Sequence, residues 1–309
     1  MPAFATRTVV AMISERAGLQ RVELDDGRRA YVLTQLMGPV AVGDRVVVNT
    51  TAVDLGLGTG GWDVIHWNLS RDAWSAPGGG HVLKLRYTSL QVDTGVADEA
   101  ATDLAGKPVV ACDLHSQLAP VAAAFAEAAP GRRLSYVMTD SAALPLALSD
   151  LVADLVERGL LAETITCGQA FGGRREAVNL HSALALTEGD AVVVAPGPGV
   201  VGTGSRLGFG GIEVATVIDA TTVLGGRPIV AVRYSGADAR PRHQGRSHHT
   251  TTAIELASHP ALAPEPPDGW AGPDVGPVAS MGRTQAEDPD FFRYAAAAGL
   301  AAAQVLSPS

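Results

Sequence analysis

A short apolar segment runs directly into a glycine-rich loop within residues 191–213, AVVVAPGPGVVGTGSRLGFGGIE, and this stretch constrains the fold more than any other part of the chain. The apolar run at 191–195 predicts a buried strand, and seven glycines follow it before residue 212. Glycine lets a backbone adopt positive φ and approach a ligand closely. A strand that leads into such a loop is typical of the binding edge of an α/β sheet.

The chain after residue 107 alternates apolar strand patterns with helical patterns. Strands are predicted at residues 108–112, 134–139, 163–167, 191–195 and 228–233. Helices are predicted at residues 116–129, from about 144 to 159, near 177–186 and at about 211–224. This alternation is typical of a mainly parallel sheet with helices on both faces. The sequence therefore predicts a Rossmann-like three-layer α/β domain.

The chain before this domain carries the pattern of short antiparallel strands separated by turns. The strand-like runs are residues 7–13, 19–24, 29–34, 40–49 and 53–65. About five to seven strands in so short a segment cannot form two packed layers, and a small barrel pairs their edges. We therefore expect a small N-terminal β-barrel-like domain.

The predicted domain organisation has four parts. They are a β-barrel-like domain (1–75), a linker with a bridging strand at 81–91 (76–106), the Rossmann-like α/β domain (107–260), and a proline-rich linker with a C-terminal helix (261–309). The last helix has an alanine-rich body and an apolar face that is costly to leave in water. We expect it to dock on the domain or on a partner subunit through Phe291, Phe292 and Leu300.

The charge balance excludes two classes of partner. The net charge is −9, and no block of Lys or Arg longer than a pair occurs, so the chain lacks the basic surface that binds nucleic acid or anionic membranes. No apolar run of about 18 residues occurs, and a cytoplasmic protein is predicted. Cys112 and Cys167 lack metal-ligand spacing and are expected to be buried thiols instead of a disulfide or a zinc pair. Homo-oligomerisation stays open.

Polar residues follow each predicted strand of the α/β domain. In an open parallel sheet the carboxyl ends of the strands share one edge, where small ligands bind at the topological switch point. We predict a small-molecule site at this edge; the alternative is that the same residues are ordinary caps and turns. The residues predicted to bind the ligand are Gly168, Gln169, Gly172, Gly173, Arg174, Gly197, Gly199, Gly202, Gly204 and Arg206.

Four residues at this edge are candidates for catalysis or metal binding. Asp113 and His115 have i, i+2 spacing, which puts a carboxylate and an imidazole on one side of an extended segment. His248 and His249 begin a predicted helix, where the imidazole pKa is lowered, and adjacent histidines point apart on a helix. We predict Asp113, His115 and His248 as catalytic, and Asp113, His115 and His249 as the ligands if a divalent metal binds. The alternative is a turn-capping aspartate with surface or loop histidines.

The glycine loop favours an anion cradle over a dinucleotide fold. Gly197-Pro198-Gly199-Val200-Val201-Gly202 has the letters of the dinucleotide fingerprint, but the loop continues where a helix should begin. Loop amides and the helix start near Gly211 can hold an anion, with Arg206 adding positive charge. Arg174 offers another guanidinium beside a glycine pair. Glu213 would suit a metal or an amine instead.

Several segments resemble one protein family. They are GPVAVGDRVVVNTTAVDLGLGTGGWDV (38–64), HVLKLRYTSLQ (81–91), GQAFGGRREAVN (168–179), GPGVVGTGSRLGFGGIE (197–213) and GRSHHTTTAIELA (245–257). In this order they are similar to an uncharacterised bacterial family, domain of unknown function 3866 (DUF3866), over most of the chain. The resemblance implies no activity and no site residue.

Two functions from different classes stay open. The first is an enzyme that binds a small anionic ligand, nucleotide-like or phosphate-like, at the carboxyl edge of the sheet, with a divalent metal as an option. The second is a non-catalytic ligand-sensing or protein-interaction scaffold that uses the same edge. Carboxylate, imidazole and guanidinium candidates on one edge favour the enzyme.

Overall fold

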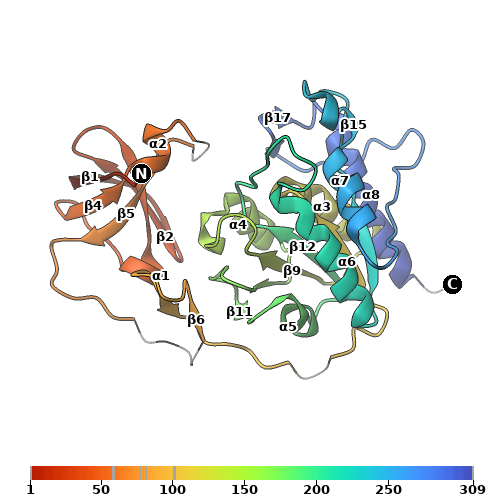
Figure 1. Cartoon of the computed structure of the whole chain (residues 1–309), viewed down its shortest axis with the longest axis horizontal. Coiled ribbons are helices and arrows are strands. Elements are labelled where there is room, and N and C mark those ends of the chain that lie inside the picture. The colour runs from red at the N-terminus through yellow and green to blue at the C-terminus, as the bar shows by residue number, and fades with distance from the viewer. Residues whose placement is uncertain are drawn as a thin grey trace. The chain divides into compact units, whose positions relative to one another are not determined.

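The structure, a computed structural model, describes residues 2–57, 60–76, 78, 80, 82–99 and 102–307. It divides into two compact units, Met1–Gly95 and Val96–Ser309 (Figure 1). The division falls inside the segment 76–106 that the sequence predicts as a linker. Each unit contains hydrophobic core residues of its own and is described separately.

The first unit is a closed five-stranded barrel, as the sequence predicts. In the order in which they pair, its strands are β1 (Phe4–Arg16), β2 (Leu19–Leu24), β3 (Arg29–Leu33), β5 (Trp62–Asn68) and β4 (Arg45–Asn49). Two short helices, α1 (Thr34–Met37) and α2 (Thr51–Asp54), follow β3 and β4. The long strand β1 closes the barrel because its first residues pair with β4 and its later residues pair with β2. Inward-facing side chains such as Leu24, which is 1% exposed, fill the interior.

The segment 81–91, predicted as a strand, is extended over a much shorter length. Only β6 (Leu83–Lys84) is strand there, and it pairs with β7 (Val92–Asp93) in a two-residue ladder. Leu85 and Tyr87 have positive φ angles of 53° and 60°, so the chain turns instead of continuing as a strand. His81 lies outside the described residues.

The second unit is built on a six-stranded sheet in which all neighbouring strands are parallel. In spatial order the strands are β11 (Arg175–Glu176), β10 (Glu163–Thr166), β9 (Leu134–Thr139), β12 (Ala191–Pro196), β8 (Pro108–Cys112) and β13 (Arg227–Ala231). Five of them correspond to the predicted strands, and the α/β architecture is confirmed. The sixth, β11, has two residues and no apolar run that would predict it.

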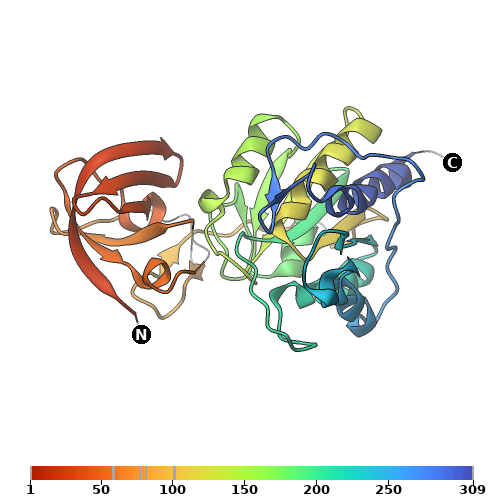
Figure 2. The ribbon, with the colours of Figure 1, turned by 90° about the horizontal axis from the view of Figure 1, so that it is seen from above.

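Helices cover both faces of this sheet (Figure 2). One face packs against α3 (Leu118–Ala128), α4 (Asp150–Glu157) and α8 (Pro289–Leu306). The other face packs against α5 (Leu180–Ala185), α6 (Val214–Val223) and α7 (His248–Leu256). The side chains of successive strand residues point alternately into the two cores, as those of Val109 and Val110 do in β8.

Two helix predictions change in detail. The helix predicted from about residue 144 begins only at Asp150, because the Ser149 hydroxyl caps α4 by accepting the Val152 amide at 3.0 Å. A separate 3₁₀ turn, η2 (Leu146–Leu148), precedes that cap. The predicted docking of the last helix takes place within the unit, since α8 packs on α3 and buries Phe291 and Phe292.

Short elements surround the carboxyl edge of the sheet. They are the 3₁₀ turns η1 (His115–Gln117), η3 (Gly210–Glu213) and η4 (Pro241–His243), the hairpin of β14 (Tyr234–Ser235) with β15 (Gly245–Arg246), and the hairpin of β16 (Ala279–Ser280) with β17 (Arg283–Thr284). The topological switch point lies between β8 and β12. These strands are neighbours, yet the chain leaves β8 toward α3 on one face and leaves β12 toward α6 on the other. This is the position at which open α/β sheets bind ligands.

Candidate functional site

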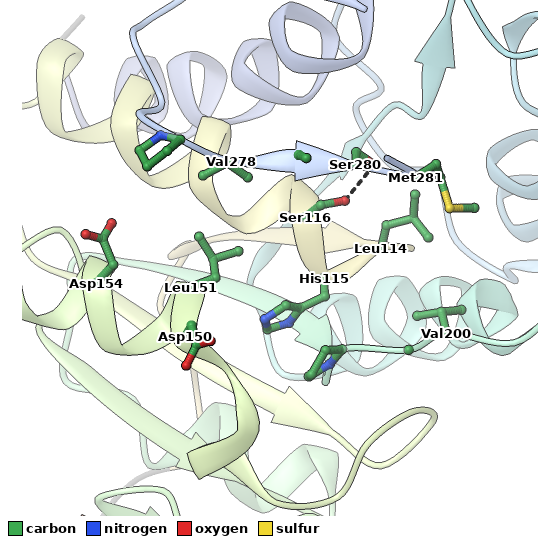
Figure 3. Close-up of a pocket in the computed structure, with 14 residues that line it drawn as sticks. Leu114, His115, Ser116, Asp150, Leu151, Asp154, Val200, Val278, Ser280 and Met281 are labelled. Atoms are coloured by element: carbon green, nitrogen blue, oxygen red, sulfur yellow. Dashed lines mark hydrogen bonds between the residues drawn. The ribbon is translucent and has the colours of Figure 1, made fainter. Parts of the chain in front are cut away.

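A cavity of about 530 Å³ lies at the switch point (Figure 3). Its walls are residues 114–116 after β8, three residues of α4 (Asp150, Leu151 and Asp154), residues 198–200 of the glycine loop and residues 277–281 around β16. Most of these side chains are apolar. The cavity has the size of small-molecule pockets, which span about 300–1,000 Å³.

His115 lines the cavity but uses both ring nitrogens within the protein. Its Nδ1 donates to the Pro196 carbonyl oxygen at 2.9 Å, so Nε2 accepts the Ser149 hydroxyl hydrogen at 2.7 Å. Burial lowers the pKa of His115, which keeps the ring neutral. The ring therefore connects the end of β12 to the capping residue of α4 through two hydrogen bonds. The nitrogens that a metal or a substrate proton would need are already occupied.

The other polar side chains of the cavity are also engaged. Ser116 Oγ donates to Ser280 Oγ at 2.8 Å, which joins η1 to β16 (Figure 3). Asp154 pairs with Arg158 one turn along α4 at 3.0 Å. Within the described lining, Asp150 and Asp154 are the only charged side chains. The cavity thus offers apolar surface and a negatively charged wall.

Three histidines, here called the histidine cluster (His243, His248 and His249), gather where η4 and α7 meet. One ring nitrogen from each lies within 4.8 Å of the others. Phe209 stacks on His249 with 3.8 Å between the ring centroids. Burial is the main reason why the pKa of each ring is lowered. The pKa falls to about 3 for His249 and to about 4 for His243, and it is also lowered for His248. All three rings are therefore neutral at pH 7.

Arg233 fixes the hydrogen position of His249. Its side chain is 3% exposed, and Nη1 donates to Nδ1 of His249 at 3.1 Å. Arginine can only donate, so Nδ1 carries no hydrogen and the hydrogen of the neutral ring is on Nε2. That Nε2 is buried and has no hydrogen-bond partner among the described residues.

Asp113 lies in the same polar region, at the end of β8. It is 2% exposed, and neither carboxylate oxygen makes a hydrogen bond of good geometry to the described part of the chain, although the Thr250 hydroxyl lies close enough to stabilise the charged form. Burial raises the pKa of Asp113 to about 6, while the positive charge of Arg233 and the Thr250 hydroxyl act in the opposite direction. The backbone of Gly211 packs directly on it, since a Cβ at Gly211 would lie 2.7 Å from Asp113 Cβ.

The predicted ligand-binding residues between β10 and β11 serve the protein's own structure. Gly168 has a φ of 65° and packs on Asp140. The next amides donate to side chains, Gln169 to Asp140 at 2.8 Å, Gly172 to Glu176 at 2.7 Å, Gly173 to Thr166 at 3.1 Å and Arg174 to Thr164 at 3.1 Å. These amides are not available to a ligand, and the Arg174 side chain is exposed.

The glycines of the predicted anion cradle have different surroundings. Gly197 packs on the Ala143 carbonyl, and Gly202 lies against the Phe209 side chain and the His249 ring. Gly199 lines the cavity with a φ of 84°, and Gly204 has open space around it. Arg206, proposed to add charge, pairs instead with Glu255 of α7 at 2.9 Å, and both side chains are exposed.

In the structure, the predicted catalytic and metal-binding residues do not form one site. Within the described residues, the histidine cluster is the only group of three side chains placed to hold a metal ion, and it includes neither Asp113 nor His115. Asp113 lies with Arg233, whereas His115 lies at the cavity. Glu213 is held by Thr139 Oγ1 at 2.6 Å, and burial raises its pKa.

Sequence reasoning did not select two residues of this region, Arg233 and Phe209. Arg233 ends the last predicted strand (228–233), and a charge at the end of an apolar run is the signal that the sequence offers for it. Both cysteines are buried thiols, as expected.

Comparisons with known proteins give a family and no activity. The family model described as a protein of unknown function (DUF3866) matches residues 29–267, and a comparison with curated proteins finds no match. No helix in the described part of the chain combines the length and apolarity needed to cross a membrane. The match spans well over half of the chain and both of its units, so the chain belongs to the DUF3866 family.

Proposed function

We propose that the protein binds a small molecule in the cavity at the switch point. The position of the cavity carries this proposal: it lies at the carboxyl ends of the neighbouring strands β8 and β12, from which the chain leaves to opposite faces of the sheet. Four segments that are far apart in the sequence supply its walls. A volume of about 530 Å³ suits a molecule of ordinary metabolite size.

The walls favour an apolar, uncharged part of the ligand. Leu114, Leu151 and Val200 offer apolar contact, and His115 makes its hydrogen bonds within the protein. The carboxylates on α4 would repel an anion placed in the cavity. An anionic group of the ligand therefore has to lie outside the cavity.

We infer an enzyme in preference to a scaffold. Asp113, with a pKa of about 6, lies at the same edge of the sheet, outside the lining of the cavity. A carboxyl group that titrates near neutral pH can exchange a proton with a substrate that extends to it. A binding scaffold has no need for a buried carboxyl group, because the burial of its charged form lowers stability.

A pair of tryptophan variants on α4 tests the cavity. Leu151→Trp places an indole at the cavity wall, whereas Val156→Trp adds the same group to the same helix at a position that is 46% exposed. In a thermal-shift screen of apolar and aromatic compounds, a ligand at a hundred times its Kd stabilises the protein by about 2.7 kcal/mol. We expect the screen to find compounds that raise the melting temperature of the wild type and of Val156→Trp but not that of Leu151→Trp. Equal stabilisation of all three would place binding outside the cavity and overturn the proposal.

A further inference from the structure

Buried polar atoms without a protein partner concentrate beside α7. Nine buried side-chain atoms lack a hydrogen-bond partner among the described residues, and four of them are Asp113 Oδ1 and Oδ2, His248 Nε2 and His249 Nε2. Buried polar atoms in folded proteins almost always have a partner, so a local group of exceptions indicates a bound molecule or ion. The remaining question is the charge of that molecule.

The hydrogen-bond donors of this region point to an anion. His249 presents an Nε2 hydrogen because Arg233 occupies its Nδ1, and the Arg233 guanidinium beside it is a permanent donor with positive charge. We propose that Arg233, His248 and His249 bind an oxyanion of the phosphate class next to Asp113. The ligand would carry this oxyanion as a phosphate ester or as free phosphate.

The electrostatics favour an anion over a divalent cation at the same three histidines. Besides burial, the charge of Arg233 lowers the pKa of all three rings, and Arg242 also lowers the pKa of His248 and His249, while Asp238 acts in the opposite direction on His243 only. Positive potential at the rings repels a metal ion and attracts an oxyanion. A metal would also require His249 to give up either its Nε2 hydrogen or its contact with Arg233.

The helix and the glycine loop add to this arrangement. The histidines stand at the N-terminus of α7, a nine-residue helix capped by Ser247, whose dipole favours negative charge. The Gly202 backbone packs beside the His249 ring, since a Cβ there would lie 3.8 Å from Nε2. His248 is only partly buried, although its Nε2 atom is buried like that of His249.

A bound oxyanion would change the state of Asp113. Negative charge nearby favours the protonated carboxyl group, which can donate a hydrogen bond to the oxyanion. One oxygen of Asp113 would then donate that hydrogen bond, and the other would accept one only from a phosphate oxygen that carries a hydrogen.

This proposal is separate from the proposed cavity ligand, because none of Asp113, Arg233, His248 and His249 lines the cavity. The variant Leu151→Trp should keep full phosphate affinity. Loss of cavity binding and loss of phosphate binding are thus distinguishable results.

Isothermal titration calorimetry of the full chain with inorganic phosphate, at about pH 6, tests the site. We expect His248→Leu and Arg233→Met to raise the Kd by about tenfold or more, because each removes a hydrogen bond to a charged group. Arg174→Met is the matched control, since it removes an exposed guanidinium after another strand of the same sheet, and it should leave the Kd within about twofold. His248→Leu is the more informative variant if Arg233→Met lowers the melting temperature, because His248 is only partly buried.

Nitrogen-15 NMR of the imidazole rings gives an independent test. We expect the hydrogen of free His249 on Nε2, and a change of the His248 and His249 ring signals on addition of phosphate. A hydrogen on Nδ1 of His249 would overturn the argument. Binding of Zn²⁺ without binding of phosphate would identify a metal site and also overturn it, as would equal loss of phosphate affinity in Arg174→Met.

Discussion

Asp113 holds its carboxyl group in a position where neither oxygen makes a hydrogen bond of good geometry to the described structure. The ionised form is more costly to bury than the neutral form, and this difference raises the pKa of Asp113 to about 6. Arg233 offsets only part of that cost. At neutral pH the side chain is therefore expected to lower the free energy of unfolding.

Asp113→Asn should remove a pH-dependent loss of stability. The carboxyl group of the unfolded chain ionises near pH 3.8, but in the folded protein it ionises at about pH 6, so the folded state loses stability as the pH rises through this window. The shift corresponds to about 3 kcal/mol. Urea unfolding at about pH 4 and pH 8 measures the free energy of unfolding of both proteins. From the lower to the higher pH, this free energy should rise in the variant relative to the wild type by about the same amount. A difference that is independent of pH would contradict the assignment.

The sequence placed Asp113, His115 and the two adjacent histidines at one edge of a sheet, which is where they lie. It could not predict which ring atoms stay available. The hydrogen position of His115 is set by Pro196 and Ser149, 81 and 34 residues away, and that of His249 by Arg233. Such partners are brought together only by the tertiary fold.

At the scale of elements, the glycine loop after β12 has two kinds of glycine. Some allow the backbone to pack tightly against neighbouring loops, as Gly211 does on Asp113, and others have free space, as Gly204 does. Glycine content alone predicts a loop that can approach a ligand. It does not distinguish an approach to a ligand from an approach to another part of the same chain.

Alanine substitutions in this loop should separate the two kinds. A Cβ at Gly211 would lie 2.7 Å from Asp113 Cβ and 2.8 Å from Asp113 O, so Gly211→Ala should cost about 1–3 kcal/mol of stability. Gly204→Ala meets nothing within 4 Å and should change stability by less than about 0.5 kcal/mol. Denaturant unfolding monitored by circular dichroism measures both. Similar costs for the two variants would disprove the packing role of Gly211.

Four predicted strands of the second unit, β8, β9, β12 and β13, each contain a run of mostly apolar residues bounded by turn signals, whereas β10 (ETIT) is marked by its β-branched threonines and isoleucine. Strand β11 was missed because two polar residues carry no such pattern. The order of the strands in the sheet also could not be predicted from the sequence. Hydrophobic pattern reports which residues are buried, whereas order depends on where each crossover returns to the sheet.

At the scale of the whole molecule, the two units have separate cores and different spectroscopic reporters. Three of the four tryptophans, Trp62, Trp67 and Trp74, belong to the first unit, while every helix longer than four residues belongs to the second. Tryptophan fluorescence therefore reports mainly on the barrel. Far-ultraviolet circular dichroism at 222 nm, a helix band, reports mainly on the α/β unit.

Core truncations should affect one signal at a time. Leu24→Ala in the barrel and Leu155→Ala in α4 remove side chains that are 1% and 0% exposed, and each should cost about 2–5 kcal/mol. We expect Leu24→Ala to shift the fluorescence transition alone and Leu155→Ala to shift the circular dichroism transition alone. If either variant moves both transitions together, the units unfold as one cooperative body.

The strand order of the second unit has a consequence for biosynthesis. The neighbours of β8 in the sheet are β12 and β13, and both follow it late in the chain. During translation β8 has no partner strand until residues 191–196 have left the ribosome, and β9, once synthesised, also lacks its β12 neighbour until then. Pairing between segments so distant in sequence slows folding and leaves apolar strand edges exposed to association. The nascent chain therefore carries an unpaired, fully apolar strand for much of its synthesis, and it is in this interval that we expect it to depend most on chaperones.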